Sequence, residues 1–408
     1  MCGHIYVFRQ SRWVARNGTT TIYKQYGIRQ STVSSKGVLK LTPHQVTAFT
    51  LRRQYLTQPA NQPLEVVSRL VAIQAQYSAS VPLAIWARNP CLSADWLKAA
   101  LFETKTLVKT WCLRGTVHIF ASADLAMLVQ AVGEQQLTNF DYFMKTRRGI
   151  DGQQIRSLNK AIFRALAQHP LIRSELHENV PELASIGGAS WGLDVKGLAF
   201  IGALVLADSD DIETRFARRD VWLPNLSWEP PSQADAQREL LFRYLDAYGP
   251  STRQDFAHWC GLKMKTVQAI FETCAQELIP AKVTGWYGDY YFRRQDVLLL
   301  KEDDEVPAAI RFLPKFDPLL MGYKNKTRFI DEEYLSRVYR PAGQIEAVVL
   351  LQGRAMASWR TTLQKAKLQL TVIPFRRLVR REHSLVKDTA EELAAFLGAK
   401  GLDLIVQS

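Results

Sequence analysis

The sequence predicts an α+β fold in which three tandem winged helix-turn-helix domains precede a C-terminal β-rich module. Between Leu39 and Phe120, three helical segments come before two strand-like segments, an order typical of a winged helix. A similar order recurs in residues 153–228 and again in 233–300, whereas the pattern after Lys301 is strands with one closing helix. We therefore divide the chain into a basic flexible extension (1–38), winged helices 1, 2 and 3 (39–150, 151–230 and 231–303) and a C-terminal α+β module (304–408).

In the first repeat, Thr42 is predicted to cap a helix that has Pro43 at its first position. A second helix begins at Pro63, and a third is predicted from Ser93 to Phe102. Two strands follow, which the Arg114-Gly115 pair separates. The predicted strands are Thr106–Leu113 and Thr116–Phe120.

The second and third repeats are read from the same signals. In the second, helices at 155–167 and 173–178 precede a Gly187-Gly188 break, a helical run at 197–207 and a strand at 221–223. In the third, helices at 240–248, 253–259 and 265–278 precede a hairpin with strands at 283–286 and 290–293. After an acidic linker at 302–305, the module has strands at 347–351, 355–359 and 368–374 and a closing helix at 389–397.

The charge favours a polyanionic partner, with nucleic acid ahead of an anionic membrane surface. The chain of 408 residues has 52 Lys and Arg against 39 Asp and Glu, a net charge of +13. Seven of these charges lie in residues 1–40, which contain no acid, so that +6 remains for the rest of the chain. The charge alone is therefore a weaker argument for DNA than it first looks.

Cysteine usage and hydropathy indicate a cytoplasmic protein without a metal site or a membrane partner. The five cysteines are dispersed and form no CxxC pair, which argues against a disulfide framework or a structural zinc. No apolar run approaches the ~20 residues that a membrane-spanning helix needs. The catalytic motifs GxGxxG and HExxH and the P-loop are also missing.

Two polar clusters remain. The first is Gln74-Ala75-Gln76, which follows an apolar helical stretch. Residues i and i+2 of a helix point about 200° apart, so the two amides can converge only where helical geometry stops, and we place Gln76 at a helix end. The alternative is one surface glutamine and one capping glutamine.

The second cluster is Arg114, Thr116 and His118, at the predicted hairpin. With the two-residue period of a strand, Thr116 and His118 share one face. A guanidinium, a hydroxyl and an imidazole beside a wing suit phosphate and sugar contacts. The alternative is a structural hairpin in which the arginine pairs with a carboxylate and the histidine is satisfied in the core.

These clusters, in this order and at this separation, resemble the AlkZ-like family of winged-helix DNA glycosylases. The resemblance covers about residues 39–400 and extends to Tyr248–Leu262 (YGPSTRQDFAHWCGL), Leu313–Tyr323 (LPKFDPLLMGY) and Gly353–Trp359. It implies a C-shaped array of three winged helices that cradles duplex DNA, with the family's Gln, apolar residue, Gln/Asp signature at Gln74-Ala75-Gln76. One departure is Lys324-Asn325-Lys326, where the family pattern has an acidic residue.

The resemblance implies a monofunctional glycosylase that hydrolyses N7- or N3-alkylated purines in duplex DNA, interstrand crosslinks being a further candidate substrate. Such purines already carry positive charge, so a Gln that orients water is sufficient chemistry. The expected protein is a cytoplasmic, nucleoid-associated bacterial monomer without metal or small-molecule cofactor. The predicted catalytic residues are Gln74 and Gln76, and the predicted DNA contacts are Arg114, Thr116, His118, Asp317, Tyr323 and Lys324.

Two other functions fit the same residues. A winged-helix transcriptional regulator would bind DNA without cutting glycosidic bonds. A basic scaffold for protein or RNA would show no preference for duplex DNA.

Overall fold

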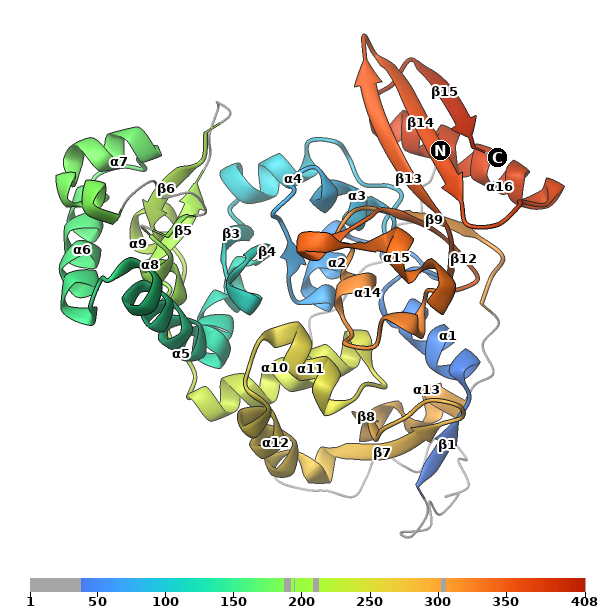
Figure 1. Ribbon diagram of the computed structural model, residues 1–408, viewed down its shortest axis with the longest axis horizontal. Coiled ribbons are helices and arrows are strands. Elements are labelled where there is room, and N and C mark those ends of the chain that lie inside the picture. The colour runs from blue at the N-terminus through green and yellow to red at the C-terminus, as the bar shows by residue number, and fades with distance from the viewer. Residues whose placement is uncertain (1–37, 187–191, 194, 208–212, 302–305, 408) are drawn as a thin grey trace, which may run out of the picture. The chain divides into compact units, whose positions relative to one another are not determined.

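The computed structural model describes residues 38–186, 192–193, 195–207, 213–301 and 306–407 (Figure 1). The chain divides between Val38 and Leu39, and the unit Leu39–Ser408 is described below. The predicted basic extension (apart from Val38), the Gly187-Gly188 break and the acidic linker at 302–305 lie outside the described residues.

Local signals correctly predicted the start of the first segment. Helix α1 (Pro43–Arg53) begins with a capping box, because the Thr42 side chain accepts from the Gln45 backbone and the Gln45 side chain accepts from the Thr42 backbone. Helix α2 (Pro63–Leu70) ends at Val71, whose φ is 69°. Shorter helices follow at α3 (Ser80–Trp86) and α4 (Trp96–Lys98), the latter running on into a π-turn at Ala99–Glu103.

The predicted first hairpin is present as β3 (Leu107–Trp111) and β4 (Val117–Ala121), and it belongs to a larger sheet. The strand order is β2-β4-β3-β5-β6, where β2 is Ile73–Gln74, β5 is Leu204–Ala207 and β6 is Arg215–Arg218. Gln74 lies opposite His118 on β4, and Lys109 of β3 lies opposite Leu206 of β5. One sheet therefore joins residues from the first two predicted repeats.

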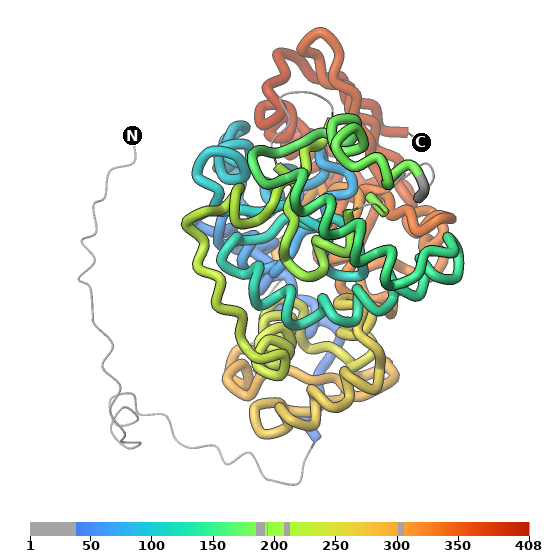
Figure 2. Tube along the Cα trace, turned by 90° about the vertical axis from the view of Figure 1, so that its left-hand side faces the viewer, coloured from blue at the N-terminus to red at the C-terminus, as the bar shows by residue number. Residues whose placement is uncertain are grey.

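The second segment corrects two predictions. Residues 197–207 are not one helix, since α8 (Lys196–Phe200) ends before Gly202 and β5 follows. Residues 221–223 are not a strand, because Arg219–Trp222 form the short helix α9. Helices α5 (Leu125–Phe143) and α6 (Gly152–Ala165) contact α8, and α8 packs against β3 and β5. The green segments of this part of the chain face the viewer in Figure 2. Helix α7 (Arg173–Asn179) was correctly predicted.

The third segment contains α10 (Gln233–Tyr248), α11 (Arg253–Cys260) and α12 (Met264–Thr273). Its hairpin is β7 (Leu278–Val283) with β8 (Tyr290–Arg293), so the first strand starts five residues earlier than predicted. The short helix α13 (Val297–Lys301) closes the segment.

The first residues of the unit pack on this third hairpin. Strand β1 (Leu39–Leu41) pairs in parallel with β7, and α1 buries Val46 and Phe49 against Val283 and Phe292. The first strand and helix of the predicted domain 39–150 therefore pack on residues near 280, outside that domain.

The C-terminal module is a five-stranded sheet in the order β15-β14-β13-β12-β9, with the helix α16 (Arg380–Phe396) beside it. The strands β12, β13 and β14 were predicted, whereas β9 and β15 were not. Between β9 and β12 lie the short helices α14 (Pro318–Met321) and α15 (Leu335–Val338) and the strand pair β10-β11 (Tyr339–Arg340 with Gln344–Ile345). The sheet strands are β9 (Ile310–Leu313), β12 (Val348–Leu351), β13 (Arg354–Gln364), β14 (Lys367–Pro374) and β15 (Gly401–Val406).

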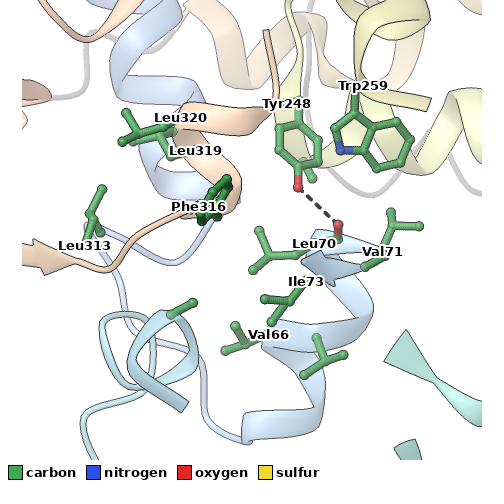
Figure 3. Close-up of a cluster of buried hydrophobic side chains, with 14 of the residues drawn as sticks. Val66, Leu70, Val71, Ile73, Tyr248, Trp259, Leu313, Phe316, Leu319 and Leu320 are labelled. Atoms are coloured by element: carbon green, nitrogen blue, oxygen red, sulfur yellow. Dashed lines mark hydrogen bonds between the residues drawn. The ribbon is translucent and has the colours of Figure 1, made fainter. Parts of the chain in front are cut away.

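The large core cluster runs beneath the Gln74-Ala75-Gln76 segment. Figure 3 shows Tyr248 beside Leu70, with Ile73 and Val66 farther away in the same cluster, and the Tyr248 hydroxyl donates to the Leu70 carbonyl oxygen at 3.1 Å. This bond satisfies a carbonyl at the end of α2, where the helix has no partner of its own to offer. The backbone that leads into Gln74 is thereby fixed on a buried aromatic support. In the part of the chain that the structure describes, no helix is long and apolar enough to cross a membrane.

Candidate active site

Gln74 and Gln76 lie at the edge of the first sheet, where β2 ends. Gln74 is in β2 and is buried at 7% exposure, whereas Gln76 follows in a bend and is exposed. Between them, the Ala75 N–H donates to the Val117 carbonyl oxygen at 2.8 Å, which holds the segment against β4. The prediction that Gln76 ends a helix is wrong: α2 ends at Leu70, and the amides converge because the chain leaves a strand.

Arg114 fixes the orientation of both amides. Its Nη2 donates to Gln74 Oε1 at 2.9 Å, and Gln74 Nε2 donates to Gln76 Oε1 at 3.3 Å. A guanidinium can only donate, so Gln74 must present its oxygen to Arg114 and its NH₂ to Gln76. The Gln76 oxygen accepts this bond with one lone pair and keeps a second one for another donor.

Arg114 itself is fixed by the third segment. It sits in the turn between β3 and β4 with φ of 55°, and its Nη1 donates to the Trp259 carbonyl oxygen of α11. Gly261, with φ of 82°, ends α11 beside it, and a Cβ there would lie 3.1 Å from the Arg114 Cα. This close approach requires glycine, and it holds α11 against the turn.

Burial keeps the imidazole of His118 neutral. Its Nδ1 donates to the Thr116 carbonyl oxygen at 2.9 Å, and burial together with the charge of Arg114 lowers the pKa of His118 to about 3. The prediction of a DNA contact is therefore wrong for His118, which is 1% exposed and follows the alternative of a histidine satisfied in the core. Arg114 does not take the alternative's carboxylate partner, because its two terminal nitrogens bond to a backbone carbonyl and to Gln74.

A pocket of about 500 Å³ opens beside Gln76 and is lined by Thr116 as well. Its walls come from β3, β5 and β6 and from the segments that hold Arg173 and Lys196. The Thr116 hydroxyl donates to the Leu113 carbonyl oxygen at 3.2 Å, which leaves its oxygen free to accept. Gln76 and Thr116 are thus the two predicted site residues that face open space together.

The C-terminal module reaches the other side of Gln76 through its neighbour Tyr77. The Tyr77 hydroxyl donates to Gln344 Oε1 at 2.9 Å, and its ring stacks on Phe316 with 5.3 Å between centroids. The amide pair therefore lies where the first sheet, α11 and the C-terminal module meet.

The chain is similar to known proteins over most of its length. The model of the family described as DNA glycosylase AlkZ-like matches residues 67–396. The chain belongs to the AlkZ-like DNA glycosylase family. It is thus a DNA glycosylase, a hydrolase of N-glycosidic bonds that serves DNA repair, and the predicted family and enzyme class are confirmed.

A similar protein sequence and a similar solved structure both come from Streptomyces sahachiroi. An interstrand DNA cross-link repair glycosylase is 26% identical over 390 residues, which are 89% of this chain and 99% of that protein. The solved structure of DNA glycosylase AlkZ matches with a TM-score of 0.79 and 22% identity, over 90% of this chain and 100% of that one. The second match shows that the fold is shared.

Two residues predicted to contact DNA in this AlkZ-like chain are core residues instead. Asp317 is 0% exposed, caps α14 and accepts from both terminal nitrogens of Arg88 at 2.8 and 2.9 Å. Tyr323 is 2% exposed, and its hydroxyl donates to the Tyr248 carbonyl oxygen. Neither side chain has surface to offer to DNA, so these two predictions are wrong.

The Lys324-Asn325-Lys326 loop contains one exposed and one half-buried lysine. The Lys324 side chain is exposed, and its contact with DNA stays a prediction. The Lys324 backbone N–H donates to Asp255. Lys326 Nζ donates to the Tyr323 carbonyl oxygen and lies 3.2 Å from His258 Nε2. Burial and the charge of Arg114 lower the pKa of Lys326 to about 8. Asn325, where the family pattern has an acid, accepts from Thr327 and caps the turn.

Sequence reasoning missed the residues that support the site. Trp259 acts through its backbone carbonyl, which no sequence pattern marks. Lys109 and Lys196 line the pocket beside Gln76, and the one signal for Lys109 was a charged residue in the middle of an apolar strand. Among the described residues, no three His, Cys, Asp or Glu side chains come together as metal ligands.

Proposed function

We propose that this glycosylase hydrolyses cationic N7- or N3-alkylated purines in duplex DNA, using a water molecule that Gln76 orients. The observation that carries the proposal is the chain of hydrogen bonds from Arg114 through Gln74 to Gln76, which fixes an exposed amide oxygen at the mouth of a pocket. The relative named an interstrand DNA cross-link repair glycosylase supports a substrate alkylated on its bases and makes crosslinks a second substrate class to test.

The chemistry of the residues fits a substrate that is already activated. An amide is not basic enough to deprotonate water at neutral pH, so the Gln76 oxygen accepts a hydrogen bond from the water and aims the water oxygen at C1′. The attacking water loses its proton to the solvent once the C–O bond has formed, while the base leaves neutral. A purine alkylated at N7 or N3 is a good leaving group because it departs neutral, and the remaining task is positioning. Well-oriented groups can contribute on the order of 7–11 kcal/mol to such a step. An undamaged purine needs an acid that these residues do not supply.

The direct test is release of N7-methylguanine from a duplex. The purified protein is incubated with an oligonucleotide that carries one N7-methylguanine, and abasic sites are converted to strand breaks with alkali. We expect breaks at the modified position above the spontaneous background, and none in an undamaged duplex. A protein that binds the duplex but yields no excess breaks would be the non-catalytic regulator instead.

We propose that the helices and hairpins form three winged helices in a C-shaped array, with residues 39–150, 151–230, 231–303 and 304–408 as its parts. Three hairpins that each follow helices support this division. We further propose that the protein acts as a cytoplasmic monomer on the nucleoid, without metal or cofactor. Among the predicted DNA contacts, Lys324 is exposed and Arg114 and Thr116 are half-buried.

The pH dependence of base release follows from the charges of the groups at the site. The Gln amides do not titrate, the pKa values of His118 and His258 are about 3 and 4, and that of Lys326 is about 8. Both histidines are therefore neutral, and Lys326 is charged, throughout the window between these values. We expect the single-turnover rate of base release to be flat from about pH 5 to pH 7. A limb in the profile near pH 6.5 would show that a titrating base takes part.

Residues 1–38 are expected to be dispensable for base release. They form a unit of their own, and the site residues named above all lie in Leu39–Ser408. Their removal takes away six positive charges, which should weaken non-specific binding at low salt without changing the single-turnover rate at saturating enzyme by more than about twofold. A much larger loss in the 39–408 protein would give the extension a catalytic role.

A further inference from the structure

Among the described residues that line the pocket beside Gln76, the charged side chains are all basic. Three cationic side chains line it, and the described lining residues include no Asp or Glu. The lining residues are Ala75, Gln76, Ser78, Lys109, Trp111, Gly115, Thr116, Val117, Arg173, Gly192, Lys196, Leu206, Thr214 and Phe216.

Two of these cations, Lys109 and Lys196, have no acidic partner among the residues that the structure describes. Lys109 Nζ donates to Ser78 Oγ at 3.3 Å, and Ser78 is two residues beyond Gln76. Burial lowers the pKa of Lys109 and of Lys196, and no acidic group in the described part of the chain raises either one. Burying a cation without a counter-ion is costly, so the arrangement is stabilised when an anion enters.

The third cation, Arg173, lies over the Phe216 ring at 5.5 Å, at the far wall of the pocket. Phe216 belongs to β6, and Lys109 is on β3 of the same sheet. A paired sheet with Lys196 at the start of α8 holds these groups in a fixed frame. The site is thus preorganised, unlike a patch of mobile surface lysines.

We propose that this pocket binds one internucleotide phosphate of the DNA, adjacent to the nucleotide whose glycosidic bond is cut, with Lys109 and Lys196 as its ligands. The inference rests on the proposed function and deepens it, because a phosphate held in the pocket that Gln76 lines sets the register of the strand against the oriented water. An ammonium is a suitable point-charge ligand for a phosphate oxygen. Thr116 and Thr214 offer hydroxyls on the same walls.

The test combines lysine variants with a neutral phosphate. The probe is a duplex that carries N7-methylguanine on a 2′-fluoro sugar, whose glycosidic bond resists hydrolysis, with single methylphosphonates placed one by one around the lesion. Wild type, Lys109→Met and Lys196→Met are compared by fluorescence anisotropy, with Lys160→Met as a matched exposed lysine on α6. Lys109→Arg keeps the charge, and thermal melts verify folding.

In wild type, we expect one or two methylphosphonate positions to weaken binding about tenfold, as for loss of a charge-assisted bond. In Lys109→Met and Lys196→Met, the same replacements should cost less than about twofold, because the partner is already gone. The slope of log K against log salt should fall by about one for each variant, and should be unchanged in Lys160→Met and Lys109→Arg.

Equal methylphosphonate effects in wild type and both lysine variants would overturn the proposal. It would also be overturned if inorganic phosphate raised the melting temperature of wild type but not of Lys109→Met and no methylphosphonate position mattered, since the pocket would then serve free phosphate. Base release from the hydrolysable duplex is measured in parallel. Its absence would refute the proposed glycosylase substrate while the methylphosphonate comparison still decided the pocket.

Discussion

Replacing Gln76 by alanine is expected to lower the single-turnover rate of N7-methylguanine release by about 10²–10³-fold, the usual loss for one preorganised polar group at a reaction centre. The Gln76 oxygen is held by Gln74, which Arg114 orients in turn. Alanine removes the acceptor that aims the water, while the pocket and the DNA contacts remain. The measurement is the rate at saturating enzyme, so that a change in binding does not enter.

The variant is a clean one because the Gln76 side chain is exposed. Truncation of an exposed side chain normally changes the free energy of unfolding by less than about 0.5 kcal/mol. Gln153→Ala is the matched control, since the Gln153 side chain is exposed like that of Gln76 and lies in the first turn of α6. Gln76→Glu retains an acceptor oxygen and should be clearly more active than Gln76→Ala. A Gln76→Ala protein with undiminished base release would remove Gln76 from the mechanism.

Replacing Asp317 by alanine is expected to destabilise the fold by about 3–5 kcal/mol. Asp317 and Arg88 are both 0% exposed, and Arg88 also donates to Gln54 Oε1. Loss of the carboxylate leaves a buried guanidinium without a counter-charge, and it also removes the cap of α14. The measurement is the urea midpoint of unfolding, compared with that of wild type.

Two further proteins separate the buried charge from a general effect of losing an Arg–Asp pair. The Asp331–Arg354 pair is exposed on both sides, so Asp331→Ala should cost only about 0–1 kcal/mol. The double variant Arg88→Met/Asp317→Leu removes both buried charges together and should unfold closer to wild type than Asp317→Ala does. If Asp317→Ala and Asp331→Ala were equally stable, the buried pair would have no special role.

How much the sequence predicted depended on the range of the interactions. The start of α1 was predicted because Thr42, Pro43 and Gln45 make its cap among themselves. The β3-β4 hairpin was predicted for the same reason. Strand β2 is two residues long and exists only through its pairing with β4, so no local pattern could place Gln74 in it.

In the candidate site, too, features set by near neighbours were predicted and features set by distant partners were not. The amide pair was recognised from three adjacent residues, and its need for non-helical geometry was correct even though the helix end was not. The role of Asp317 was misjudged because its partner Arg88 is 229 residues away. A motif shows which side chains matter, but burial decides whether a carboxylate faces the solvent or the core.

The sequence by itself determined the order of helices and hairpin in the third segment, the first hairpin, the family, and the pair Gln74 and Gln76, because caps, turns and strand periods depend on near neighbours. The tertiary structure alone decided that Arg114 orients this pair and that His118 is neutral. It also decided that Lys109 and Lys196 line a pocket with no Asp or Glu among its described lining residues. These properties depend on desolvation and on partners from distant segments, such as the Trp259 carbonyl 145 residues from Arg114. Only the folded chain brings such groups into contact and removes the water around them.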